Sequence, residues 1–217
     1  MRIRIYVEGP TEQVGLPRLL AHLKLPKRRI DVLPLKGSRF LKEIGRRAAV
    51  ILTREHDSHV FACPDLAPRD SYEGTQWAYT DYESLQDVLQ REVREALKER
   101  LGARKLVGAM RRFHAHPFRH DFEVVLLACP ELLKRRLGTE ADISKHYSRK
   151  PEDQDFEQYP KKVVQRLFRK FAKRRYRPTY DCPRVLDYMT AEHVNRIRRA
   201  CPRFGELATA LEQLLSA

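Results

Sequence analysis

RIRIYVEGPTE, residues 2–12, joins a strand-like segment directly to an acid, a glycine and a proline. Residues 2–7 alternate isoleucine or valine with arginine or tyrosine, which is the period-2 pattern of a strand with one buried face. The strand therefore ends at the carboxylate of Glu8. Thr11 is placed to cap the helix that the spacing predicts over 11–23. An acid in this position fits either a surface loop or a metal-binding active site.

The alternation of strand and helix patterns continues through the first two thirds of the chain. Further strands are predicted at 30–35, 59–63 and 111–118, and further helices at 40–53, 81–104 and 121–137. Strands that alternate with helices across short connections predict an α/β fold, with a mostly parallel sheet flanked by helices. A long ordered loop is expected at 66–80, where Tyr72, Trp77 and Tyr79 either stack on bases or pin the loop to the core.

The composition of the chain changes after Gly138. Residues 139–160 are polar, and residues 161–177 carry nine lysines or arginines among 17 residues, interleaved with apolar side chains. This interleaving predicts a helix with one apolar and one cationic face. The last two helices are predicted at 191–200 and 205–215. We therefore expect an α/β core over 1–138 and a basic, mainly helical C-terminal extension over 139–217, packed together.

The chain carries a strong excess of positive charge. Lysine and arginine total 43 against 29 acids, which gives a formal net charge of +14 and a pI near 9.9. Such an excess favours nucleic acid as the partner, because neutralised phosphates release counterions; an inert basic surface is the alternative. Of the two nucleic acids, we expect DNA more than RNA. No apolar run approaches the roughly 20 residues that span a membrane, and no signal peptide is recognisable. We expect a cytoplasmic protein with no membrane segment.

The four cysteines are scattered, and each precedes a proline: Cys63, Cys129, Cys182 and Cys201. No pair has C-x-x-C spacing, so neither a zinc site nor a disulfide framework is expected. We expect buried thiols that behave as small hydrophobic side chains.

Acids follow three of the predicted strands: Glu8 directly, and Asp65 and Glu123 a little further on. In an open parallel sheet, ligands bind outside the carboxyl ends of the strands. Mg²⁺ and Mn²⁺ prefer oxygen ligands, and crowded carboxylates would repel one another without such a cation. A basic protein with an acidic edge is suited to metal-assisted phosphodiester hydrolysis, although acids in ordinary surface loops give the same pattern.

Four sequence blocks resemble a bacterial family known as domain of unknown function 4276. The blocks are VEGPTE at 7–12, VFACPD at 60–65, RHDFEVVLL at 119–127 and IRRACPRFGEL at 197–207, with a weaker match at Tyr159, Pro160, Lys161, Lys162 and Tyr176. The first two blocks also resemble the TOPRIM core of topoisomerases, primases and overcoming-lysogenization-defect (OLD) nucleases, in which one strand ends in Glu-Gly and a later strand in Asp-x-Asp. The resemblance spans nearly the whole chain.

The resemblance implies a TOPRIM-like fold and a metal-dependent nuclease, acting in bacterial defence or DNA processing with an ATPase partner. It implies that Glu8, Asp65 and Glu123 bind Mg²⁺ or Mn²⁺ or act as acid–base groups. Lys161 and Lys162 would contact phosphates or steady transition-state charge, or else form part of a solvated cationic face. The alternatives are a non-catalytic nucleic-acid-binding subunit with a degenerate TOPRIM site and a structural protein–protein module.

One position departs from the TOPRIM pattern. Ala67 stands where the second acid of Asp-x-Asp is expected, and Asp70 is too far along the chain to replace it directly. Either Glu123 takes that place, or only one metal binds, or the site is degenerate. Glu12, one helical turn past Glu8, either faces the same site or is an exposed helix acid.

Basic or imidazole side chains near these acids, or on the cationic helix, are predicted to contact nucleic acid: Lys36, Arg119, His120, Lys161, Lys162, Arg166 and Lys170. His114 and His116 share one face of a predicted strand, which permits metal binding, although contact with solvent or phosphate is simpler. A homodimer is kept open as an oligomeric state.

Overall fold

The computed structural model describes residues 1–23, 25, 29–35, 37–66, 72–148, 150–153 and 159–216. The chain forms two compact units. Unit 1 consists of Met1–Gly9 and Pro26–Pro117, and unit 2 of Pro10–Leu25 and Phe118–Ala217. The chain therefore passes from unit 1 to unit 2 after Gly9, returns to unit 1 at Pro26 and passes to unit 2 again after Pro117. The sequence instead predicted a single boundary after Gly138.

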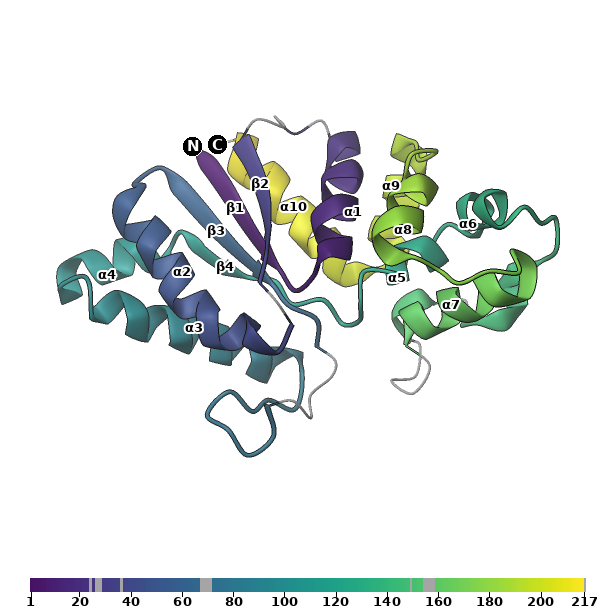
Figure 1. The fold of residues 1–217 in the computed structure, drawn as a ribbon. Coiled ribbons are helices and arrows are strands. Elements are labelled where there is room, and N and C mark those ends of the chain that lie inside the picture. Colours follow the sequence, from purple (N-terminus) through teal and green to yellow (C-terminus); the bar gives the residue numbers. More distant parts are fainter. Residues whose placement is uncertain are drawn as a thin grey trace. The chain divides into compact units, whose positions relative to one another are not determined.

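In the described part of the chain, unit 1 is built on a four-stranded sheet in the order β2-β1-β3-β4 (Figure 1). Its strands are β1 (Arg2–Val7), β2 (Ile30–Pro34), β3 (Ser58–Cys63) and β4 (Phe113–Ala115). All pairings are parallel, and Val7 of β1 lies opposite both Pro34 and Cys63. The predicted α/β fold with a parallel sheet is confirmed. The strand predicted at 111–118 is too long, because β4 ends at Ala115 and Pro117 has no N–H to donate.

One face of this sheet carries two long helices, α2 (Phe40–Arg54) and α3 (Tyr82–Lys98), and α4 (Ala103–Met110) follows α3 (Figure 1). Tyr6, Val60 and Ala62 of the sheet pack in one buried cluster with apolar side chains of these helices. The helix predicted over 81–104 is wrong at its end, because Gly102 has extended backbone angles and separates α3 from α4.

Unit 2 is helical in its described part. Its longer helices are α1 (Pro10–Leu20), α6 (Pro130–Leu137), α7 (Pro160–Phe171), α8 (Pro178–Leu186), α9 (Ala191–Ala200) and α10 (Pro202–Ser216), and a short α5 (Val124–Leu127) precedes α6. Single 3₁₀ turns occur at Ala21–Leu23, Gly37–Arg39 (in unit 1), Ile143–His146 and Pro151–Asp153. α7 has the predicted apolar face, since Val163, Leu167 and Phe168 are buried. α8 was not predicted, because its sequence shows little apolar periodicity.

In the described part of unit 2, five helices begin at a proline: α1, α6, α7, α8 and α10. Proline suits the first helical position, because the N–H that it lacks would have no partner there and its φ is already helical. This explains why the single helix predicted over 121–137 is wrong: Pro130 starts α6 as a new helix after α5. Cys129 and Cys201 precede two of these prolines, and all four thiols are buried and free, as expected.

Candidate functional site

Two of the predicted metal ligands lie at the carboxyl edge of the unit 1 sheet. Glu8 directly follows β1, and Asp65 is the second residue after β3, the neighbouring parallel strand. Adjacent strands lie about 4.8 Å apart, so the register places the two backbone segments side by side. Glu8 is half-buried and Asp65 is 8% exposed. The carbonyls of Val7 and Glu8 accept hydrogen bonds from the N–H groups of Leu35 (2.7 Å) and Gly37 (3.3 Å), which fix this end of β1.

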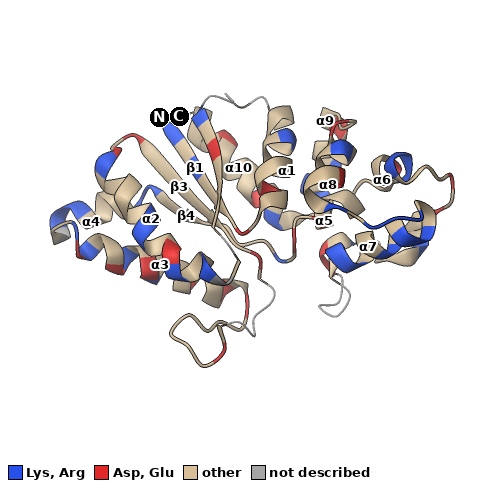
Figure 2. Cartoon of the chain, in the orientation of Figure 1, with Lys and Arg blue, Asp and Glu red and all other residues tan. Residues whose placement is uncertain are grey.

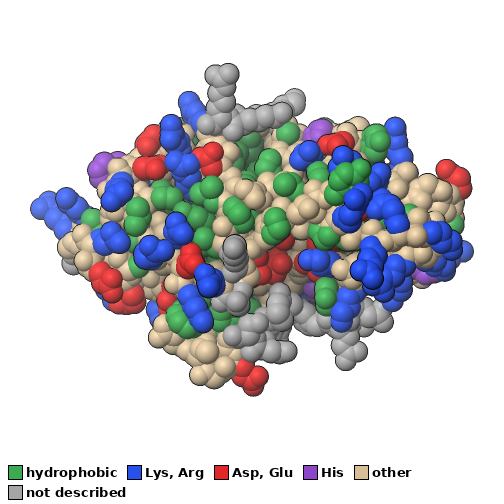
Figure 3. Space-filling view, viewed as in Figure 1, with side chains coloured by type: hydrophobic (Ala, Val, Ile, Leu, Met, Phe, Trp, Pro, Cys, Tyr) green, Lys and Arg blue, Asp and Glu red, His purple; other side chains and the backbone are tan. Residues whose placement is uncertain are grey.

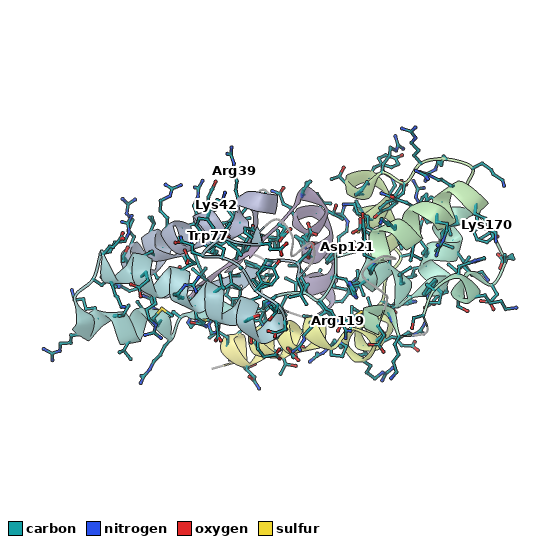
Figure 4. The ribbon with its side chains drawn as sticks, turned by 90° about the horizontal axis from the view of Figure 1, so that it is seen from below. Arg39, Lys42, Trp77, Arg119, Asp121 and Lys170 are labelled. Carbon is teal, nitrogen blue, oxygen red and sulfur yellow. The ribbon has the colours of Figure 1, made fainter. Side chains whose placement is uncertain are left out.

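The aromatic side chains of the predicted loop mostly pin it to the core. Tyr72 and Tyr79 are 4% and 9% exposed, and their ring centroids lie 6.0 Å apart. The hydroxyl of Tyr72 donates a 3.3 Å hydrogen bond to the carbonyl of Gly37, next to the end of β1. Trp77 is half-buried, with the ammonium of Lys42 lying 5.4 Å from its ring centroid (Figure 4).

His59 on β3 and His114 on β4 contact each other, and His116 directly follows β4. Nε2 of His114 and Nδ1 of His59 are 3.0 Å apart, and the ring of His114 stacks on Phe61 at 4.4 Å. Burial, with smaller contributions from His59 and His116, lowers the pKa of His114 to about 4, so the imidazole is neutral at pH 7. His116 stacks on the same phenyl ring at 5.5 Å. These contacts serve the packing of the sheet.

Unit 2 gathers a group of acids, Glu12 from α1 and Asp121 and Glu123 from the segment before α5. Glu12 is 5% exposed and Glu123 is 1% exposed, so the interpretation of Glu12 as an exposed helix acid is wrong. Asp121 accepts hydrogen bonds of 3.0 and 3.2 Å, one at each carboxylate oxygen, from the backbone N–H of Lys161 (Figure 4 labels Asp121). It thereby caps α7, whose first position is Pro160.

The charge of Glu123 is poorly compensated. Burial raises the pKa of Glu123 to about 7; the ammonium of Lys161 opposes the rise and the carboxylate of Glu12 adds to it. The Oε1 atom of Glu123 and the hydroxyl of Tyr176 are both buried without a well-formed hydrogen bond among the described residues, although the Tyr176 hydroxyl also acts to lower the pKa of Glu123. A buried carboxylate oxygen without a donor fits a hard cation, because the ion supplies the missing positive charge.

The predicted phosphate-contacting residues of α7 share one exposed face. Lys162, Arg166 and Lys170 follow one another at four-residue intervals, and all three are exposed. Figure 2 shows basic residues along α7. Arg166 donates a 3.0 Å hydrogen bond to the carbonyl of His146, and Nζ of Lys170 lies 3.1 Å from Nε2 of the same residue. Lys161 is half-buried, and its backbone N–H is held by the acid group.

The remaining predicted nucleic-acid contacts have different surroundings. His120 is 1% exposed, its Nε2 lies 3.0 Å from the carbonyl oxygen of Glu152, and burial lowers its pKa. Arg119 is 44% exposed and lies 3.5 Å from Asp153. Lys36 lies outside the described residues. Of the two described side chains, Arg119 presents its charge to solvent, whereas His120 holds the backbone of Glu152.

The predicted ligand set draws on both units, because Glu8 and Asp65 belong to unit 1 and Glu123 to unit 2. Within the described residues, no group of three or more histidine, cysteine, aspartate or glutamate side chains has the arrangement of a metal site. Ala67 and Asp70 lie outside the described residues. The ligand set of Glu8, Asp65 and Glu123 therefore stays a prediction.

Sequence reasoning missed two structurally important acids of unit 2, Asp121 and Asp181. The carboxylate of Asp181 is fully buried and accepts hydrogen bonds from the side chains of Arg136 and Arg174 and from the backbone N–H of Arg177. Burial acts to raise the pKa of Asp181, but these hydrogen bonds outweigh it and hold the pKa at about 2. Asp121 could have been identified from its position two residues before Glu123. Nothing in the local sequence pattern indicated that Asp181 is important.

A family model with the description "Domain of unknown function (DUF4276)" matches residues 7–212. This range includes all four sequence blocks and confirms the resemblance that they predicted. Comparison with curated proteins finds no match.

Two solved structures are similar over nearly the whole chain. The C-terminal region of the Xanthomonas campestris pv. campestris OLD protein aligns with a TM-score of 0.47 and 14% identity, covering 96% of this chain and 97% of that chain. The C-terminal region of the Burkholderia pseudomallei OLD protein aligns with a TM-score of 0.47 and 13% identity, covering 95% and 98%. No helix in the described residues is both long and apolar enough to cross a membrane.

Proposed function

This chain belongs to the DUF4276 family, and from the carboxylates described above we propose that it is a metal-dependent nuclease-like protein that hydrolyses phosphodiester bonds of DNA or RNA. The observation that carries the proposal is Glu123, which is 1% exposed and has an Oε1 atom without a described hydrogen-bond donor. Lys161 and Tyr176 stabilise the charged form of Glu123 only in part, so a further cation at this carboxylate would stabilise it. We propose that Mg²⁺ or Mn²⁺ is that cation, with Glu8, Asp65 and Glu123 as its ligands.

When bound, such an ion polarises a phosphate and lowers the pKa of a water ligand. The side chains of the protein have other parts in the reaction. Glu8, half-buried at the edge of the sheet, would accept a proton from the attacking water if a single ion binds. Lys161 would stabilise the negative charge that develops on the phosphoryl oxygens, and Asp121 fixes the start of its helix.

The charge of the chain supports a nucleic-acid substrate. The net charge is +14, and Lys162, Arg166 and Lys170 line one exposed face of α7. Arginine and lysine on such a face contact phosphates and position a nucleic acid without reading its sequence. DNA is the first expectation. A separate ATPase partner, a role in bacterial defence or DNA processing, and action in the cytoplasm are part of the proposal, and they rest on the sequence resemblance and composition.

A second function, a non-catalytic nucleic-acid-binding subunit, is favoured by one specific observation. Ala67 replaces the second acid of the TOPRIM pattern. Such a subunit would use the same cationic face of α7 but would have no need of a divalent ion. The requirement for metal therefore separates the two functions.

The test is a cleavage assay on supercoiled plasmid, linear duplex, single-stranded DNA and RNA, with Mg²⁺ or Mn²⁺ and with a chelator. We expect cutting that the chelator abolishes. Glu8→Gln and Glu123→Gln should abolish cutting while binding stays within about threefold of wild type, which is less than 1 kcal/mol. Glu140→Gln, which alters a fully exposed acid of unit 2, is the matched control and should cut normally. Wild-type protein that binds these substrates but cuts none of them supports the non-catalytic alternative.

A further inference from the structure

Two exposed tyrosines of unit 2 are each covered by arginines. Tyr180 on α8 and Tyr188 just beyond it are 38% and 43% exposed, which is unusual for large side chains in the described part of the chain. The guanidinium groups of Arg184 and Arg177 lie 3.5 and 3.9 Å from the ring centroid of Tyr180. That of Arg135 lies 3.6 Å from the centroid of Tyr188. These are contact distances for a cation on the face of an aromatic ring.

These side chains lie along α8 and at its two ends. Tyr180 and Arg184 lie four residues apart and share one face of α8, whereas Arg177 is the extended residue just before the helix and Tyr188 lies two residues past its end. Arg135 joins these side chains from α6, which packs against α8. We call these five residues the arginine row.

The positive charge of the arginine row is not cancelled by the acids of its own segment. Asp181 is engaged by Arg136 and Arg174, whose side chains lie 2.7 Å from it. Asp187 lies 2.8 Å from Arg18 on α1. Both acids within the α8 segment are thus paired with arginines outside the row, and the row remains cationic.

The tyrosines hold the arginines in a conformation that suits phosphate. A guanidinium that lies flat on a ring keeps its N–H donors in its own plane. Nη1 of Arg184 donates to the carbonyl of Tyr180 (3.0 Å), which fixes that guanidinium and leaves its other donors for a ligand. Planar arginine forks bind phosphate oxygens through two parallel hydrogen bonds. Because stacking already restricts these long side chains, less conformational entropy is lost when a phosphate binds.

We propose that the arginine row binds the phosphate backbone of a nucleic-acid strand. Lysine and arginine side chains gather on the part of unit 2 that carries α7 and α8 (Figure 3). The inference rests on the proposed nucleic-acid function, and it adds a second contact surface to the cationic face of α7.

The test measures binding of a labelled 20-base-pair duplex by fluorescence anisotropy, without divalent ions, over a series of salt concentrations. The row variant is Arg177→Gln with Arg184→Gln in the full chain. The matched control is Arg94→Gln with Arg100→Gln, which removes two exposed charges from unit 1. We expect the row variant to bind about tenfold more weakly, and the slope of log affinity against log salt to flatten by about 1.8, or 0.9 for each lost phosphate contact. The control should stay within about twofold of wild type.

A second pair of variants tests the role of the ring. Tyr180→Phe keeps an aromatic face and should bind as wild type, whereas Tyr180→Leu should bind about threefold more weakly, the loss expected for an exposed cation–π contact. If wild type binds the duplex but the row variant matches the control in affinity and salt slope, the arginine row does not bind the phosphate backbone. The proposed function then still stands. If wild type binds no DNA or RNA, both fall.

Discussion

The phenyl ring of Phe122 occupies the space directly over Gly15 of α1. A Cβ atom at Gly15 would lie closer to the ring carbon Cε1 than real Cβ contacts allow. Phe122 stands between Asp121 and Glu123, and Gly15 lies one helical turn beyond Glu12. This close contact therefore brings the acid of α1 together with the two acids that precede α5.

Gly15→Ala should destabilise unit 2 by about 1–3 kcal/mol, because Phe122 must move or strain to admit the methyl group. Urea unfolding followed by circular dichroism measures the change. Gly108→Ala is the matched control: nothing lies within 4 Å of a Cβ there, and alanine in a helix interior should be neutral or stabilise by up to about 1 kcal/mol. Equal stability of the two variants would show that the contact over Gly15 does not constrain unit 2.

Asp181→Asn should destabilise the protein by about 3–5 kcal/mol, because the partly buried guanidinium groups of Arg136 and Arg174 lose their counter-ion. Asp187→Asn removes an exposed pair with Arg18 and should cost less than about 1 kcal/mol. Because the pKa of Asp181 is held at about 2, below its usual 3.8, its stabilisation is complete above that usual value and is lost as the pH falls toward 2. Urea unfolding of both variants at neutral and acid pH measures these differences.

Glu152 makes the free energy of unfolding depend on pH in the direction opposite to that of Asp181. Burial raises its pKa to about 7, although the backbone N–H of Arg203 donates a 3.3 Å hydrogen bond to it. The folded protein therefore holds this proton more tightly than the unfolded chain does, and stability should fall as the pH rises from about 4.5 to about 7, by on the order of 3 kcal/mol. Glu152→Gln should remove this component in urea unfolding at pH values on either side of that window. A variant with the wild-type pH dependence would refute it.

Exchange of Lys162, Arg166 and Lys170 for glutamine should weaken duplex binding by a similar factor for unrelated sequences, because phosphate contacts carry no sequence information. The salt slope should flatten by about 2.7 if all three contact phosphates. Anisotropy titrations with two duplexes of different sequence measure both quantities. A loss confined to one of the two sequences would instead point to base readout.

Much of the fold could be predicted because its periodicity is local. The strand at 2–7 and the helix at 191–200 have the predicted bounds, since alternation and helical spacing are strong there. The break at Gly102 is also a local effect, but one glycine in a periodic stretch gives little warning. The membership of α1 in unit 2 could not be predicted, because it depends on contacts such as that of Gly15 with Phe122, more than a hundred residues apart.

Only those features of the candidate site that depend on local sequence patterns could be predicted. Glu8 and Asp65 lie at the sheet edge where the ends of two strand patterns placed them. The burial of Glu12 could not be derived from its helical position, because a neighbour distant in sequence decides which face of α1 is covered. The same is true of His120, whose contact with Glu152 joins residues 32 positions apart.

Binding of Mn²⁺ to the whole protein, followed by the paramagnetic resonance signal of the free ion, tests the central claim most directly. We predict that wild type binds Mn²⁺ and that Glu8→Gln, Asp65→Asn and Glu123→Gln each weaken binding by more than about tenfold, as loss of a ligand should. Glu140→Gln, at a fully exposed position, should bind as wild type does. Wild-type protein that leaves the signal of millimolar Mn²⁺ unchanged, or three ligand variants that bind as tightly as Glu140→Gln, would contradict the claim.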